Sequence, residues 1–109
     1  MLHHEAVEKR VRTYSLADIK SAFADAARLN RTKMSIRGAA ALGMDAAAVV
    51  AVIQGLQAAD FDKSATAHHD HTRWHDSYKP TVEGRPLYLK FTLDDEGKLL
   101  LTSFKEATE

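Results

Sequence analysis

Residues 86–93 read PLYLKFTL, and their side chains alternate between apolar and polar. A β-strand places successive side chains on opposite faces, so this period of two is typical of a strand that is buried on one side. The leucines and the phenylalanine share one face, whereas Tyr88, Lys90 and Thr92 share the other. We therefore expect a sheet with one face on the core and the other toward solvent.

Turn signals divide the chain on either side of this strand, at Asp70, at Glu83-Gly84 and at Asp95-Glu96-Gly97. The segments between these turns are rich in β-branched and aromatic residues. They predict strands at about residues 61–68, 72–79, 86–93 and 98–105, joined by short hairpins. We expect the second half of the chain to form a four-stranded antiparallel meander.

The first half carries helix signals instead. A capping box that begins at Ser15, and the apolar spacing after it, predict a helix over residues 16–28. Gly43 suits a helix C-terminus, and Asp45 suits the N-cap of the apolar helix that follows. Residues 31–36 are open to two interpretations, a short strand or the approach to the Ala-rich segment of residues 38–42. This order predicts an α+β fold, with two to three N-terminal helices packed on one face of a C-terminal antiparallel sheet.

Length and composition narrow the class of protein. A chain of 109 residues suits one compact domain, which we expect to span residues 1–109. Apolar residues make up 45% and charged residues 28%, the balance of an ordinary globular protein. No apolar run is long enough to span a bilayer and the N-terminal segment lacks the apolar core of a secretory signal, so we expect a cytoplasmic protein without membrane contact. The absence of cysteine excludes disulfides, thiolate zinc sites and thiol nucleophiles.

The net charge is zero, which argues against a nonspecific nucleic-acid binder. The charge is unevenly distributed, because residues 9–37 contain only Asp18 and Asp25 as acids. The basic residues of this segment are Lys9, Arg10, Arg12, Lys20, Arg28, Arg31, Lys33 and Arg37. A solvated helix face and a phosphate-binding footprint explain this local excess equally well.

Residues 60–78, DFDKSATAHHDHTRWHDSY, gather a lysine, an arginine, histidines and aromatic rings. Histidine moves protons near neutral pH, lysine and arginine neutralise phosphate, and aromatic rings stack on bases. The stretch therefore indicates chemistry, with nucleic acid as a candidate substrate. His68, His69 and His71 also invite interpretation as a metal site. They straddle a turn with Asp70 as the nearby carboxylate, so we expect no metal there.

Four motifs of the second half stand in the order and spacing of a known family: DFDKS, HTRWHDSYKP, LYLKF and LLLTSFKE. The preceding segment, VVAVIQGLQAADF, resembles the helix that comes before the sheet in that family. On these motifs the chain resembles toxins of the MqsR (motility quorum-sensing regulator) family. The resemblance implies a RelE-like ribonuclease fold and sequence-specific cleavage of messenger RNA, which inhibits translation and growth. It also implies neutralisation by the cognate antitoxin of a type II toxin-antitoxin module.

The resemblance places catalytic residues at Lys63, His75, Tyr88 and Lys105. At the position of His75 the matching family member holds glutamine, so the chain departs from the family pattern there. Cleavage by attack of the RNA's own 2′-hydroxyl needs a base, an acid and cations for the phosphorane, but no protein nucleophile, metal or cofactor. Our working mechanism has Lys63 and Lys105 bind the phosphate while His75 or Tyr88 moves protons.

Arg73 and Lys90 are expected to assist by binding RNA, and the expected partners are messenger RNA and a DNA-binding antitoxin encoded nearby. Each strand lysine could instead be a solubilising charge, and Tyr88 could simply pair across a hairpin. Trp74 has the opposite strand parity to His75, so we expect it in the core. Two alternatives to the endoribonuclease stay open, a noncatalytic protein-binding or regulatory module and a small metal-binding regulator.

Overall fold

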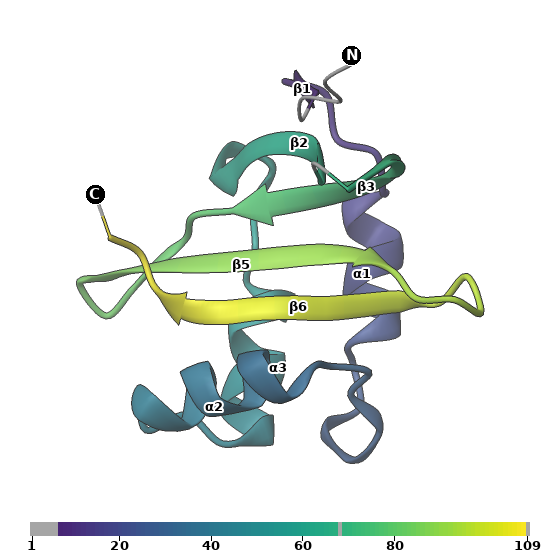
Figure 1. The fold of residues 1–109 in the computed structure, drawn as a ribbon. Coiled ribbons are helices and arrows are strands. Elements are labelled where there is room, and N and C mark those ends of the chain that lie inside the picture. The colour runs from purple at the N-terminus through teal and green to yellow at the C-terminus, as the bar shows by residue number, and fades with distance from the viewer. Residues whose placement is uncertain (1–6, 68, 109) are drawn as a thin grey trace.

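The computed structural model describes residues 7–67 and 69–108. In this part of the chain, three α-helices precede most of a six-stranded antiparallel sheet (Figure 1). The helices are α1 (Leu16–Ala22), α2 (Lys33–Ala41) and α3 (Ala46–Gln54), with 3-10 turns at Ala26–Arg28 and Ala58–Asp60. The strands are β1 (Glu8–Lys9), β2 (Phe61–Ala67), β3 (Asp70–Tyr78), β4 (Thr81–Val82), β5 (Arg85–Leu93) and β6 (Leu99–Glu106). This arrangement confirms the predicted α+β fold.

The predicted meander is present, because β2, β3, β5 and β6 pair in that order and each is antiparallel to its neighbour. β1 extends the sheet beyond β2, and β4 forms a short hairpin with the start of β5. Sequence patterns missed these two strands because each is only two residues long and therefore shows no alternation. The strand predicted over residues 61–68 ends at Ala67, and His68 lies outside the described residues.

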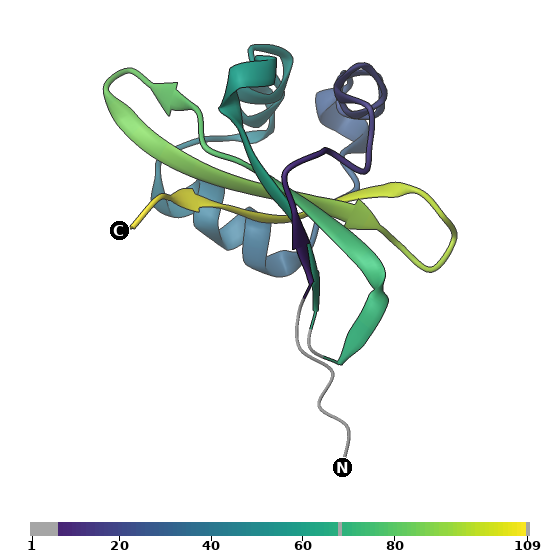
Figure 2. The same ribbon diagram turned by 90° about the horizontal axis from the view of Figure 1, so that it is seen from above.

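Two helices cover one face of the sheet. Figure 2 shows α1 and α3 together on one side, and Figure 1 shows α2 alongside the edge strand β6. The ring of Phe23 in α1 lies 5.4 Å from the ring of Phe91 in β5, measured between centroids. The fully buried side chains between the layers include Ile19, Phe23, Val49, Ile53, Tyr78, Leu89, Phe91 and Phe104. The face of residues 86–93 that was predicted to be apolar is therefore the face that packs on the helices.

Side chains and a glycine set the helix ends. Ser15, Thr32 and Asp45 each accept a hydrogen bond from the backbone N–H three residues further on. Gly43 follows α2 with a φ of 73°, a left-handed conformation that favours glycine at a helix end. The predicted capping roles of Ser15, Gly43 and Asp45 are confirmed. No single helix in the described segments is long and apolar enough to cross a membrane, although α2 and α3, bent by 93°, meet the criteria of length and composition when taken together.

The helix predicted over residues 16–28 is too long. α1 ends at Ala22, and a separate 3-10 turn begins after Asp25. The side chain of Asp25 accepts a hydrogen bond from the N–H of Ala27 at 2.9 Å. Because this local contact starts a new turn, it competes with continuation of the helix.

The strand interpretation of residues 31–36 is wrong. Thr32 caps α2, and only Arg31 forms a β-bridge, an isolated parallel one with Leu101 of β6. The N–H of Thr32 donates to the carbonyl oxygen of Leu101 at 3.1 Å. This segment therefore attaches the start of α2 to the edge of the sheet.

Candidate active site

The polar face of β5 lies at the centre of the predicted site. Lys90 is opposite Ser77 of β3 on one side and opposite Ser103 of β6 on the other. Ser77 is in turn opposite Lys63 of β2, so the four residues form one row across four strands. Because residues that are directly opposite share a face, all four side chains lie on the face that α1 and α3 leave open.

Neighbouring rows complete the set. Tyr88 is opposite Lys105 of β6, whose Nζ atom lies 5.5 Å from the centroid of the Tyr88 ring. On the other side of the Lys90 row, His75 of β3 is opposite Ala65 of β2. Strand pairing therefore gathers the four predicted catalytic residues around Lys90, although they come from distant parts of the sequence.

Two adjoining hollows open on this face. The first hollow has a volume of about 430 Å³, and its lining includes Lys63, Arg73, His75, Tyr88 and Lys90. The second hollow, of about 350 Å³, is lined by Lys105 and shares Tyr88 and Lys90 with the first. The structure thus brings all the predicted site residues except Lys105 to one hollow and places Lys105 in the next.

Lys63 has an acidic partner that sequence patterns did not identify. A register shift at Asp62 separates Phe61, which packs toward the core, from Lys63 on the open face. The Nζ atom of Lys63 donates a hydrogen bond to Oε1 of Glu8 in β1 at 2.6 Å. This contact raises the pKa of Lys63 and lowers the pKa of Glu8. Lys63 is therefore protonated at neutral pH and is suited to bind a phosphate rather than to accept a proton.

His75 lines the first hollow and is half-buried. Its Nδ1 atom is buried and has no hydrogen-bond partner among the described residues. Burial, followed by the positive charges of Lys90 and Arg73, lowers the pKa of His75 below its ordinary value of 6.5. His75 is therefore mostly neutral at pH 7 and can accept a proton there.

Burial raises the pKa of Tyr88 and lowers the pKa of Lys90. The Ser77 hydroxyl and the charge of Lys63 act in the opposite direction on Tyr88, but burial is the larger effect. For Lys90, the charge of Lys105 adds to the effect of burial. Tyr88 consequently keeps its proton and can act as an acid. Within residues 7–67 and 69–108, neither Lys90 nor Lys105 forms an ion pair with a carboxylate, so both can bind an anion.

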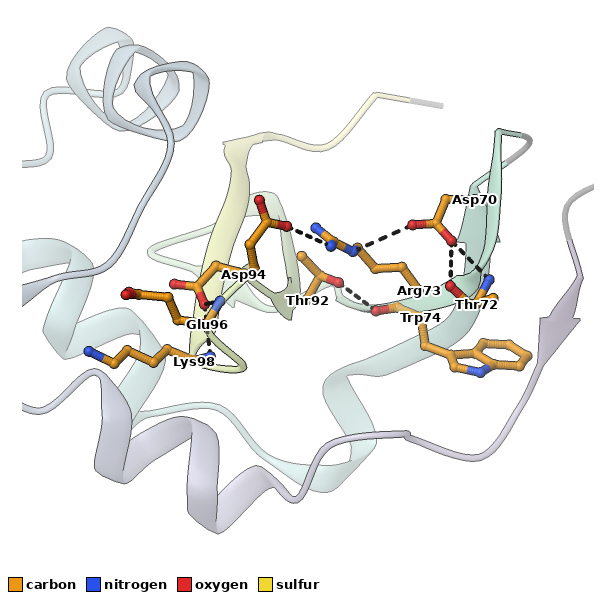
Figure 3. Close-up of polar contacts among 9 residues, drawn as sticks. Asp70, Thr72, Arg73, Trp74, Thr92, Asp94, Glu96 and Lys98 are labelled. Carbon is orange, nitrogen blue, oxygen red and sulfur yellow. Dashed lines mark hydrogen bonds and ion pairs between the residues drawn. The ribbon is translucent and has the colours of Figure 1, made fainter.

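Arg73 lies at one end of the first hollow and forms ion pairs there. Its guanidinium group donates to Asp95 at 2.9 Å and lies 3.7 Å from Asp70, so it links the start of β3 to the turn after β5 (Figure 3). Asp95 is the main cause that raises the pKa of Arg73. The predicted contact of Arg73 with RNA therefore requires the exchange of a carboxylate for a phosphate.

Of the remaining residues of the histidine-rich stretch, His69 also lines the first hollow. His69 and His71 are exposed, and no group of three or more His, Cys, Asp or Glu side chains in the described part of the chain is arranged to hold a metal ion. Trp74 does not lie in the core as predicted. It is half-buried, with the Nζ atom of Lys9 from β1 4.1 Å from its ring centroid. Strand parity placed Trp74 opposite to His75 correctly, but the lysine of β1 lies over its ring.

These features define a small α+β protein with a lysine-lined, hollowed sheet face that carries a neutral histidine and a protonated tyrosine. Residues 12–106 match the family model described as motility quorum-sensing regulator, toxin of MqsA. The chain is also 36% identical over 100 residues to the mRNA interferase toxin MqsR of Escherichia coli K12, an alignment that covers 92% of this chain and 99% of that protein. The chain therefore belongs to the MqsR toxin family, as its motifs indicated.

Proposed function

We propose that this protein is the toxin of a type II toxin-antitoxin module and that it cleaves messenger RNA at specific sequences, which inhibits translation and growth. The observation that carries the proposal is the gathering of Lys63, His75, Tyr88 and Lys90 around one hollow, with Lys105 beside it. The similarity to a protein named mRNA interferase toxin supports the same reaction class. The site of action would be the cytoplasm, where messenger RNA is translated.

In the proposed mechanism the 2′-hydroxyl of the RNA gives its proton to His75 and attacks the adjacent phosphorus. A bond forms between O2′ and phosphorus, and the bond between phosphorus and O5′ breaks, which leaves a 2′,3′-cyclic phosphate. Tyr88 gives its proton to the leaving O5′. Lys63, Lys90 and Lys105 offset the negative charge of the phosphorane. The lowered pKa of His75 supports its role as the base, and the raised pKa of Tyr88 means that it carries a proton to give at neutral pH.

We also propose that a small antitoxin, DNA-binding and encoded nearby, neutralises this protein. The family description, which pairs the toxin with MqsA, supports a partner of this kind. The reaction as written requires no metal or cofactor, because the nucleophile belongs to the substrate and lysines supply the positive charge.

The test is cleavage of a defined messenger RNA by the purified protein, with and without a chelator. We expect cleavage that is insensitive to the chelator, and a loss of at least about a hundredfold in Lys63→Ala, the typical effect of removing one group that stabilises transition-state charge. Lys98→Ala, which removes an exposed lysine in the turn before β6, should retain activity. Circular dichroism would show that both variants keep the fold.

Full activity in Lys63→Ala would overturn the assignment of that residue. Absence of cleavage by the wild type would overturn the proposed endoribonuclease activity and favour a noncatalytic protein-binding module. Cleavage that stops on addition of chelator would contradict the metal-independent mechanism.

A further inference from the structure

Apart from Lys105 and the shared Tyr88 and Lys90, the residues that line the second hollow have no part in the mechanism above. Its volume of about 350 Å³ lies within the range of sites that hold small ligands. Tyr88 and Lys90 form its boundary with the first hollow. A group bound over Tyr88 and Lys90 therefore has one hollow on each side.

The outer wall of the second hollow comes from α2. Met34, in the first turn of this helix, lines the hollow and is 71% exposed. α2 is fixed against β6 close to this point, because a Cβ atom on Gly38 would lie 2.0 Å from the carbonyl oxygen of Phe104. The backbone at Met34 is thus held close to the hollow, its side chain offers an apolar, polarisable surface, and a thioether makes favourable contacts with aromatic rings.

Lysines supply positive charge to the same hollow. Lys79 lines it and is 3.8 Å from Asp62, a long distance for an ion pair. Lys105 has no ion-pair partner within the described ranges. Glu106 follows Lys105, but strand alternation directs it to the opposite face. The combination of an apolar surface with cations suits a ligand that has both an aromatic and an anionic part.

Resting on the proposed function, we propose that the second hollow is a nucleotide subsite, which binds the nucleotide on the 3′ side of the cleaved bond with its base against Met34 and its outer phosphate near Lys79. The scissile phosphate then lies over Tyr88 and Lys90. The direction of the RNA chain across the two hollows follows from His75. This residue lines only the first hollow of the two, and it must reach the 2′-hydroxyl of the nucleotide on the 5′ side. The 3′ side is also the side of the leaving O5′, which receives the proton of Tyr88.

RNA is the favoured occupant because the hollow adjoins the catalytic groups directly. An RNA chain that is cut internally must continue past the cleaved bond on both sides. The second hollow is the continuation of the site toward β6 and α2, and its lysines match the charge of the RNA backbone. A protein partner at this surface is the alternative outcome of the test.

The experiment uses a short single-stranded RNA with one site that the wild type cleaves. A 2′-O-methyl group at the cleaved position allows binding to be measured without cleavage. The complete RNA is compared with a shortened RNA that ends in the scissile phosphate. We expect Met34→Ala to bind the complete RNA about tenfold more weakly, as for the loss of one buried apolar side chain, and to bind the shortened RNA like the wild type.

Ile36→Ala is the matched control, because Ile36 lies on the same helix, is 42% exposed and does not line the hollow. It should bind both RNAs like the wild type. Met34→Ala could instead bind each of the two RNAs with the affinity of the wild type, while the wild type cleaves RNA. That result overturns the proposed subsite and leaves the proposed endoribonuclease activity standing. An equal loss for both RNAs, or a loss confined to binding of a purified antitoxin, overturns the subsite as well. If the wild type neither binds nor cleaves RNA, the proposed function fails and the subsite with it.

Discussion

At the scale of single residues, the surroundings of His75 bear on its proposed role as the base, and the resemblance described above implies glutamine at this position in the family. Glutamine can only donate and accept hydrogen bonds, whereas a neutral histidine can take up a proton. Burial and the charges of Lys90 and Arg73 favour the neutral form. The environment of His75 therefore suits a base that works at neutral pH, and this is a property that glutamine lacks.

We predict that the rate of cleavage falls in acid with a midpoint below 6.5, because protonation of His75 removes the base. His75→Gln should lower the rate by about a hundredfold or more and abolish this acid limb. The measurement is single-turnover cleavage as a function of pH, together with an NMR titration of His75. His71→Gln, at an exposed position that lines neither hollow, is the control. A His75→Gln variant with the rate and pH profile of the wild type would show that glutamine suffices and that His75 is not the base.

The sequence predicted the strand face of Tyr88 and Lys90 but not the partners of the charged residues in the site. Strand parity correctly grouped Tyr88 with Lys90 because alternation is a local property. The contact between Lys63 and Glu8 joins residues that are 55 positions apart, and the contact between Arg73 and Asp95 joins residues 22 apart. Such pairs depend on how β1 and the turn after β5 are placed in space, and no local pattern contains that information.

At the scale of elements, α2 depends on a glycine in its interior. Gly38 allows the helix to approach β6 so closely that a Cβ atom would lie 2.0 Å from the carbonyl oxygen of Phe104. A backbone carbonyl in a strand cannot move away without disturbing its hydrogen bonds. The position of α2, and with it that of Met34, therefore depends on the absence of a side chain at residue 38.

We predict that Gly38→Ala lowers the free energy of unfolding. Overpacking of this kind costs about 1–3 kcal/mol, which exceeds the gain of about 1 kcal/mol that alanine offers in a helix interior. Gly55→Ala is the matched control, because Gly55 has a right-handed conformation and its added Cβ atom would lie 3.4 Å from the nearest atom. That variant should be neutral or slightly stabilised. Urea unfolding measures the free energy of unfolding of both variants. Equal stability of the two would contradict the close approach of α2 to β6 at Gly38.

The elements that the sequence predicted are those with a sustained period. β2, β3, β5 and β6 are long enough to show alternation, and their predicted bounds differ from the structure by a few residues at most. The helix after Ser15 was overextended because Asp25 starts a new turn through a side-chain contact that hydrophobic spacing does not report. The short β1 was missed although it supplies Glu8, so the sequence alone could not complete the site.

At the scale of the whole molecule, the net charge is zero, but the acidic and the basic side chains have different structural roles. Many carboxylates serve the backbone by accepting hydrogen bonds from N–H groups at turns and helix ends. They include Asp25, Asp45, Asp60, Asp70, Asp76 and Asp94. Lys90 and Lys105, which form no ion pair with the carboxylates of the described residues, lie on the open face. A neutral chain can therefore present a local cationic surface to RNA.

Only some of these lysines should contribute to the salt dependence of RNA binding. A lysine that is free in the unbound protein releases a counterion from the RNA when it binds a phosphate. Lys63 and Lys79 already have carboxylates near them, at 2.6 Å and 3.8 Å. When a phosphate replaces Glu8 at Lys63, the released carboxylate attracts a cation in its turn. Such an exchange has little net effect on the number of free ions.

We therefore predict that the logarithm of RNA affinity falls with the logarithm of salt concentration with a slope of about −1.4, from Lys90 and Lys105 at about −0.7 each. In Glu8→Gln the charge of Lys63 is no longer neutralised before RNA binds, so the slope should steepen to about −2 and affinity at low salt should rise. Glu83→Gln, which removes an exposed charge in the turn before β5, should keep the slope of the wild type. Fluorescence anisotropy with a noncleavable RNA measures all three slopes. Parallel lines for wild type and Glu8→Gln would show that Lys63 does not exchange Glu8 for a phosphate, which would remove Lys63 from the RNA-binding surface.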